Sequence, residues 1–243
     1  MSKSADFLVE IGTEELPPKA LRSLMVAFGD GLAAGIDEAR LSHGDVHTYA
    51  SPRRLAVIVD TLAGSQDDRA VEQKGPPVSV AFDDNNEPTP AATAFAARCG
   101  VPVEELERIE TSKGEWLIHK SVEQGKSAAV LLPDIIERAL AALPIPRRMR
   151  WGAGDAEFVR PVHWIVLLHG NDVIDASIMG IAAGRNSRGH RFHSSGPISI
   201  ASPADYLRAL EDKGHVIADF VRRRGMVREG VDAAAERVGG HVV

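Results

Sequence analysis

An apolar run, a glycine, two acids and a proline pair occupy residues 7–18, and this stretch constrains the fold most. The first five residues combine aromatic, aliphatic and β-branched side chains, which favour a half-buried strand. Gly12 can turn the chain sharply, and Thr13 is of a residue type that caps helix N-termini. Glu14 and Glu15 would then lie near the positive end of a helix dipole. The pattern predicts a strand followed closely by a proline-opened helix.

Apolar residues recur at three- and four-residue steps over residues 18–40, which predicts a helix with one buried stripe. Its glycines superficially resemble a dinucleotide-binding fingerprint, but that fingerprint directly follows a strand and opens a helix. We interpret them as points of close packing or of fraying near the helix end. Strands are predicted at 46–50 and 55–60, the second buried on both faces. The order β-α-β-β favours an α+β fold with helices packed on mixed or antiparallel sheets.

Later segments alternate between apolar patterns typical of helices and of strands. Residues 63–90 are expected to be mainly loop, with one short strand at 78–82. Helices are predicted at 89–99, 126–143, 204–213 and 219–238, and strands at 115–120, 158–159, 162–168 and 173–179. Prolines end the helical pattern at 126–143, and an arginine-rich segment follows. We therefore predict two α+β regions, 1–146 and 147–243.

Composition excludes several classes of protein. Hydrophobic residues at 44% and charged residues at 26% are typical of soluble globular chains. The single cysteine, Cys99, forbids an internal disulfide and suits a reducing compartment. No stretch approaches the roughly 18 apolar residues of a membrane span, and no apolar signal segment opens the chain. We therefore expect a cytoplasmic protein with no membrane association.

Metal-binding and catalytic patterns are weak. Two histidine pairs have ligand-compatible spacing, His43 with His47 and His190 with His193. Structural zinc sites usually assemble four Cys or His ligands, so we expect no metal. The chain lacks a phosphate-binding loop and a nucleophile elbow. It also lacks the sequence signatures HIGH and KMSKS, which mark one class of nucleotide-binding catalytic core, so we expect no catalytic residue. We interpret His163 as a hydrogen-bonded core histidine.

Two acids and two arginines are candidates for one polar site: Glu14, Glu15, Arg53 and Arg54. Paired carboxylates can act as acid and base, whereas acids in a first helical turn stabilise the helix. Alternatively, one acid pairs with Arg53 or Arg54 and fixes the turn between two strands. We favour a structural or partner-contact role for all four.

Local arginine clusters are the best signal for contact with RNA, because a formal net charge of −6 argues against indiscriminate phosphate binding. Two clusters contain no acid: Arg147, Arg148, Arg150 and Trp151, and then Arg185, Arg188, His190, Arg191 and Phe192. Arginine forks suit phosphates, and Trp151 or Phe192 can stack on an unpaired base. A third cluster, Arg222 to Arg224 with Arg228, lies on a predicted helix. The alternative is a solvated face or internal ion pairs with the 34 acids.

Four ordered stretches carry a resemblance to a known family: FLVEIGTEELPP at 7–18, SPRRLA at 51–56, RWG with FVRPVHW at 150–152 and 158–164, and RGHRF at 188–192. Along its whole length the chain resembles the N-terminal portion of the β subunit of bacterial glycyl-tRNA synthetase. That subunit is longer, so the resemblance implies a truncation before downstream HD-type and anticodon-binding domains.

The resemblance also implies a division of labour. In this family the α subunit holds glycine and ATP, with Mg, whereas the β subunit supplies most of the tRNA binding within an α2β2 assembly. The chain would then bind tRNA(Gly) through the two acid-free clusters and dock the α subunit, with no cofactor of its own. Two alternatives remain open. One is a stand-alone RNA-binding module that uses the same arginines. The other is a small metabolic enzyme with a polar site around Glu14, Glu15, Arg53 and Arg54.

Overall fold

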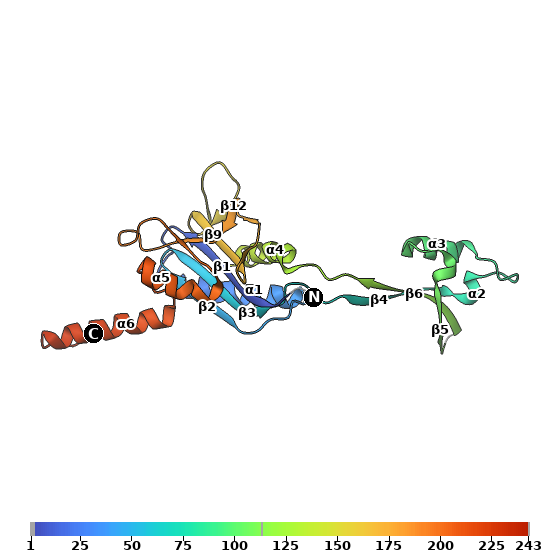
Figure 1. Cartoon of the computed structure of the whole chain (residues 1–243), viewed down its shortest axis with the longest axis horizontal. Helices are drawn as coiled ribbons and strands as arrows, with labels where there is room; N and C mark the ends of the chain where they lie inside the picture. Colours follow the sequence, from blue (N-terminus) through green and yellow to red (C-terminus); the bar gives the residue numbers. More distant parts are fainter. Residues whose placement is uncertain (1–2, 113, 243) are drawn as a thin grey trace. The chain divides into compact units, whose positions relative to one another are not determined.

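Figure 1 shows the computed structural model of the chain, which describes residues 3–112 and 114–242. The chain divides into two compact units: residues up to 66 together with those from 126 onward, and residues 67–125. The boundary expected near residue 146 falls inside the larger unit. The physical reason is that β9 (Val162–His169) pairs with β1 (Ala5–Thr13), so a strand from beyond that boundary completes the first sheet.

A seven-stranded sheet organises the described part of the larger unit. Its order is β11–β12–β9–β1–β3–β2, with β10 paired to β9, and β12 runs parallel to β9 while the other pairs are antiparallel. The mixed sheet with packed helices confirms the predicted α+β class and its β-α-β-β opening. The remaining strands are β2 (Val46–Ser51), β3 (Arg54–Leu62), β10 (Asp172–Val173), β11 (Ser177–Ile178) and β12 (Ile181–Gly184).

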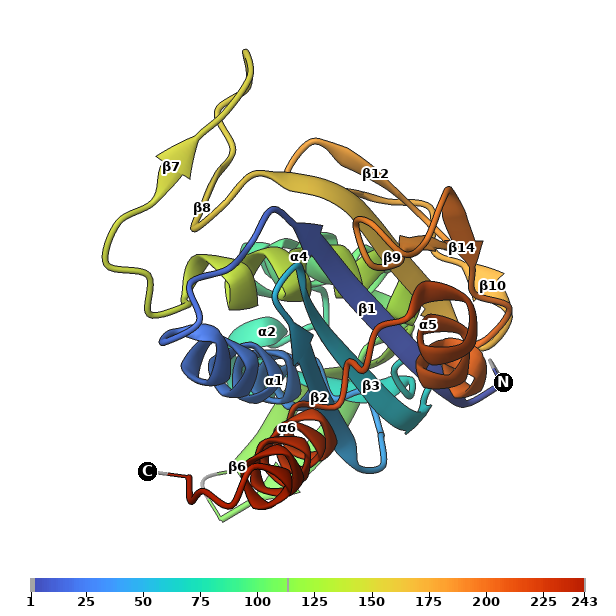
Figure 2. The same ribbon diagram turned by 90° about the vertical axis from the view of Figure 1, so that its left-hand side faces the viewer.

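Alternate residues of β1 face two different apolar layers. Phe7 and Val9 are buried in the core that contains α1 (Leu21–Glu38) and α4 (Ala128–Ala141). Leu8 belongs to the core on the opposite face, with Tyr206 of α5 (Tyr206–Gly214). Figure 2 shows α5 in front of β1 and α4 behind it. Because both faces are covered, β1 and β3 have nearly continuous apolar sequences.

The first helix confirms the predicted apolar stripe, and its glycines are points of close approach. A Cβ atom at Gly29 would lie 2.2 Å from Cγ2 of Thr48 in β2. One at Gly35 would lie 2.5 Å from Cγ2 of Ile135 in α4. Close packing, and not fraying, therefore explains these residues. The buried stripe consists of Leu21, Leu24, Met25, Phe28, Leu32 and Ile36.

The start of this helix differs from the prediction. Strand β1 continues through Thr13, which pairs with Val162, and α1 begins only at Leu21. The Thr13 hydroxyl donates to the carbonyl of Glu14 at 2.7 Å and caps no helix. Glu14 and Glu15 consequently lie in the connection and not in a first helical turn. Pairing with strands on both sides extends β1 beyond the point where local sequence suggests a turn.

The smaller unit contains a three-stranded sheet in the order β4–β6–β5 within the described residues. The expected loop over 69–77 and the expected strand at 78–82 were wrong: residues 69–77 form β4, and 78–81 form a short helix. Backbone pairing with β6 stabilises the largely polar β4, so hydrophobic alternation does not reveal it. Gly100, at φ +74°, ends α3 as predicted. The elements are β4 (Arg69–Pro77), α2 (Val78–Ala81), α3 (Pro90–Cys99), η1 (Val103–Glu105), β5 (Glu107–Thr111) and β6 (Gly114–Glu123).

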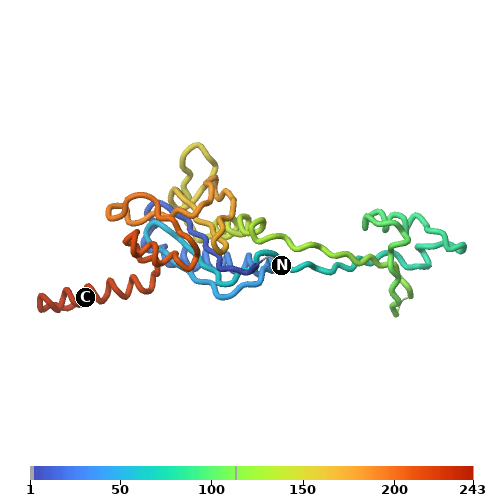
Figure 3. The backbone as a smooth tube through the Cα atoms, in the orientation of Figure 1, coloured from blue at the N-terminus to red at the C-terminus, as the bar shows by residue number. Residues whose placement is uncertain are grey.

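A small hairpin, β13 (Asn186–Arg188) with β14 (Pro197–Ser199), carries the basic loop between them. Figure 3 shows this orange segment in the same unit as the blue first strand, although the two are far apart in sequence. None of the helices in the described residues is long and apolar enough to cross a membrane. The remaining elements are β7 (Met149–Arg150), β8 (Glu157–Phe158), η2 (Pro203–Asp205) and α6 (Phe220–Arg237).

Candidate functional site

A buried ion pair connects the central strands to the basic hairpin. Arg54 is 1% exposed and Glu10 is fully buried, and Nη1 of Arg54 lies 3.2 Å from Oε2 of Glu10. The same guanidinium donates to Ser51 Oγ at 3.0 Å, to Ser187 Oγ at 3.0 Å and to the carbonyl of Arg188. Arg54 therefore ties β3 to β13.

Further donors satisfy the buried carboxylate of Glu10. It accepts hydrogen bonds from Trp164 Nε1, from the Tyr206 hydroxyl and from Ser187 Oγ, the last at 2.6 Å. Burial raises the pKa of Tyr206 well above its ordinary value, and the Glu10 charge raises this pKa further. The phenol therefore stays protonated and donates. A carboxylate removed from water needs such a full set of donors.

The sequence interpretation missed this network, since it considered Glu14 or Glu15 as the partner of Arg54. The actual partner is Glu10. One signal was available: a single acid within the apolar run of a strand covered on both faces must be neutralised or paired. Its partners are distant in sequence, and Tyr206 lies 196 residues away.

Glu14 and Glu15 lie beside Arg53 and the hairpin loop. Oε1 of Glu15 is 3.9 Å from Nε of Arg53 and 3.3 Å from Nη1 of Arg191, so the predicted pairing of one acid with Arg53 is confirmed. A backbone hydrogen bond, with the charges of Arg191 and Arg53, holds the pKa of Glu15 below its ordinary value. Glu14 pairs with Nε2 of His163 at 2.9 Å.

The same contact corrects the interpretation of His163 as a core residue. Its side chain is 38% exposed, whereas the neighbouring Val162 and Trp164 are buried. His163 therefore lies at the surface next to an acid. An apolar neighbourhood in sequence did not reveal which residue of the strand faces inward.

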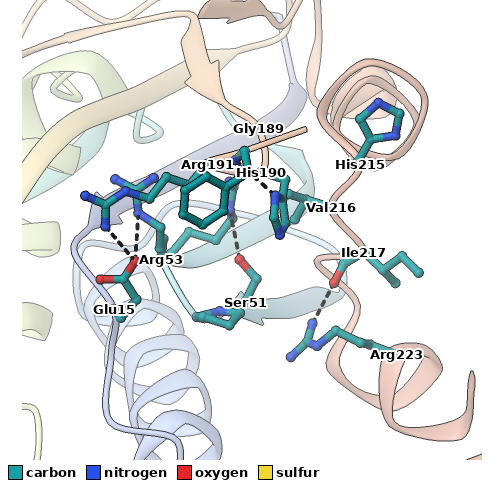
Figure 4. A pocket seen from close by; sticks show the side chains of 13 residues that line it. Glu15, Ser51, Arg53, Gly189, His190, Arg191, His215, Val216, Ile217 and Arg223 are labelled. Atoms are coloured by element: carbon teal, nitrogen blue, oxygen red, sulfur yellow. Dashed lines mark hydrogen bonds and ion pairs between the residues drawn. The ribbon is translucent and has the colours of Figure 1, made fainter. Parts of the chain in front are cut away.

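Glu15 and Arg53 meet the hairpin loop around a cavity of 330 Å³, shown in Figure 4. Three segments line it together with the single residues Glu15 and Arg223: the turn between β2 and β3, residues 189–192 of the loop, and residues 215–217 after α5. The Phe192 side chain, 84% exposed, belongs to this lining. A neighbouring cavity of 540 Å³ shares Arg53, Gly189, His190 and Arg191 with the first.

The base of the loop is anchored on the end of α5. The backbone N–H of His190 donates to the carbonyl of Gly214 at 2.7 Å, and Ser194 Oγ donates to the carbonyl of Lys213 at 3.1 Å. A Cβ atom at Gly189 would lie 2.7 Å from Cα of Gly214. Glycine is therefore required at position 189, where two backbones meet closely.

Comparison with known sequences shows the family of the chain. The glycyl-tRNA synthetase beta subunit family matches residues 7–243. The chain belongs to this family. It is 52% identical over 235 residues to the glycine–tRNA ligase beta subunit of Marinobacter nauticus, with 97% of this chain and 34% of that protein covered. It is 51% identical over 238 residues to that of Hahella chejuensis, with 98% of the chain and 34% of that protein covered. The chain thus spans about a third of the length of the curated relatives it matches.

In this beta-subunit chain, only part of the second arginine cluster gathers at the cavities. Arg188, His190, Arg191 and Phe192 line one or both of them. Arg185 instead donates to the carbonyl of Asn171 at 2.9 Å and to that of Ile200 at 3.4 Å. Its guanidinium holds backbone segments together.

The first arginine cluster makes contacts of a different kind. Arg148 donates to the carbonyl of Ala141 at 2.6 Å, at the end of α4. Arg150 lies 3.5 Å from Asp155, and Trp151 packs against the main core. The exposed Arg147 precedes them. Of the third cluster, Arg222 pairs with Glu211 and Arg223 donates to the carbonyl of Ala50, which attaches α6 to β2.

Charge is segregated between the two units. Residues 67–125 contain twelve Asp and Glu against six Lys and Arg, so this segment accounts for the whole formal charge of −6. The rest of the beta-subunit chain is balanced. The larger unit therefore repels a polyanion less than the acidic segment does.

Proposed function

We propose that this chain supplies part of the tRNA-binding surface of glycine–tRNA ligase. It would bind tRNA(Gly) and dock the catalytic α subunit, where ATP-dependent formation of glycyl-tRNA takes place. The observation that carries the proposal is the convergence of Arg53, Arg188, Arg191 and Phe192 at adjoining cavities. Membership of the beta-subunit family supports it.

The role of these residues is positioning. Guanidinium N–H groups hold phosphate oxygens, often in pairs, which fixes orientation as well as affinity. Holding a reactant in place can lower a barrier without any proton transfer. The α subunit would hold glycine and ATP, with Mg, in an α2β2 assembly in the cytoplasm, and this chain would bind no cofactor of its own.

The polar set around Glu14 and Glu15 argues against a small metabolic enzyme. Carboxylates that act as acid and base have pKa values pushed apart, with one raised. Here the pKa of Glu15 is lowered, and Nη1 of Arg191 lies 3.9 Å from Glu14 and 3.3 Å from Glu15. This environment supports a structural role for them.

We expect Arg188→Ala and Arg191→Ala each to weaken binding of tRNA(Gly) and to flatten its salt dependence. Each lost phosphate contact should reduce the slope of log K against log salt by about 0.7 to 0.9. Filter-binding titrations between about 50 and 200 mM salt measure both quantities. Arg208→Ala is the matched control, because Arg208 lies on α5 and pairs with Asp205 away from both cavities. Unchanged affinity and slope in both loop variants would remove the loop from tRNA binding.

Co-purification separates the proposal from its alternatives. Capture of the α subunit by this chain, with tighter binding of tRNA(Gly) in its presence, is the expected result. Bound RNA without any α subunit would instead favour a stand-alone RNA-binding module. Capture of neither would favour a separate metabolic enzyme.

A further inference from the structure

Two cavities with different linings meet at the hairpin loop. The first has an apolar side formed by Phe192, Val216 and Ile217 (Figure 4 labels the last two). The second is polar and includes Arg188 and Ser194. Because Arg53 and Arg191 line both, one small ligand with a flat apolar part and an anionic part can occupy the pair.

The exposed ring of Phe192 is held on a fixed backbone. The backbone N–H of Phe192 donates to Nδ1 of His190 at 3.2 Å, and the backbone N–H of His190 donates to the carbonyl of Gly214. The ring remains 84% exposed at the edge of a cavity. A large aromatic side chain presented by an anchored loop is a platform on which a base can stack.

Arg53 has an unused donor at the junction of the two cavities. Its Nε atom is buried and has no hydrogen-bond partner among the described residues; the Glu15 carboxylate is 3.9 Å away. A buried donor without an acceptor is costly, so a shift of the Arg53 side chain that brings this N–H to a phosphate oxygen would be favourable. The two linings together contain five arginines, Arg53, Arg54, Arg188, Arg191 and Arg223. The buried Glu10 neutralises Arg54, and Asp219 acts on Arg223, so three arginines stand against Glu14 and Glu15. Charge alone is therefore a weak attraction here, and stacking must contribute.

We propose that the two cavities form one site for a single unstacked nucleotide of RNA. Its base would lie in the apolar cavity against Phe192, and its phosphate would lie at Arg53 and Arg191. The inference rests on the proposed function, since tRNA would present this nucleotide. A paired RNA helix offers phosphates but keeps its bases stacked, so it cannot fill the apolar cavity. The first cavity, at 330 Å³, is near the lower end of the roughly 300–1,000 Å³ typical of ligand sites, which suits one nucleotide.

The test uses Phe192→Ala and Phe192→Tyr, with tRNA(Gly) and a fully paired RNA duplex as probes. We expect Phe192→Ala to weaken binding of tRNA(Gly) by about 5- to 150-fold, because one stacked base is lost. The salt slope should stay unchanged, since no charge is removed. Phe192→Tyr keeps the aromatic face and should restore affinity. The affinity for the duplex should be the same in all three proteins.

The outcomes separate this inference from the proposed function. If the unaltered chain binds tRNA(Gly) and Phe192→Ala has no effect, the nucleotide site is wrong while the proposed function stands. An equal loss on the duplex would also overturn the site, because it would show a general weakening. If the unaltered chain binds neither RNA, both proposals fail. Because Phe192 is exposed, Phe192→Ala is expected to keep the unfolding transition of the unaltered chain.

Discussion

Arg54→Ala is expected to lower the free energy of unfolding by about 3–5 kcal/mol. The substitution leaves the carboxylate of Glu10 fully buried without its cation. It also removes the donors to Ser51, to Ser187 and to the carbonyl of Arg188, so the hairpin loses its attachment to β3. Urea unfolding followed by far-UV circular dichroism measures the change.

The neighbouring residue provides the control for this prediction. Arg53 has a partly exposed side chain and a longer ion pair, 3.9 Å, so Arg53→Ala should cost about 1 kcal/mol or less. The double variant Glu10→Gln, Arg54→Met should recover part of the loss, because the unpaired buried charge is gone. Equal losses for Arg53→Ala and Arg54→Ala would contradict a central role for the buried pair.

Gly12→Ala is expected to destabilise the chain by about 1–3 kcal/mol or more. The added Cβ would lie 1.9 Å from Cε2 of Trp164, so the indole ring must move. The backbone cannot retreat easily, because Gly12 pairs with Arg54 on one side and with Trp164 on the other. Displacement of the ring would also break its hydrogen bond to Glu10. Thermal unfolding and tryptophan fluorescence report the two effects.

A second glycine in open space gives the matched control. A Cβ at Gly225, within α6, would meet no atom of the described residues within 4 Å. Gly225→Ala should therefore stabilise the chain by roughly 0.5–1 kcal/mol, since alanine loses less backbone entropy in a helix. Similar effects of the two substitutions would show that the contact between Gly12 and Trp164 is not tight.

Periodic apolar patterns predicted the parts of the fold that packing dictates. The apolar stripe of α1 and the apolar sequence of β3, which is buried on both faces, were both predicted correctly, because burial selects apolar residues at fixed spacing. Strand β4 could not be predicted from its sequence, since backbone pairing with β6 stabilises it. The extension of β1 through Thr13 likewise depends on a strand that lies far along the chain.

The candidate site was predictable as a set of residue types but not as a geometry. The cluster at 185–193 marks a basic segment, yet sequence does not show where each guanidinium points. Arg185 is engaged by carbonyl groups, whereas Arg191 lies at the cavities. Whether an arginine faces solvent depends on backbone acceptors from distant segments. The network around Glu10 was hidden for the same reason.

Photocross-linking tests most directly whether RNA lies at this surface. The probe is tRNA(Gly) with 4-thiouridine in place of uridine, bound to the chain, irradiated and mapped by peptide mass spectrometry. We predict cross-linked peptides that contain residues 188–193 or Arg53. Cross-links confined to the acidic segment 67–125, with none at the hairpin loop, would contradict the account.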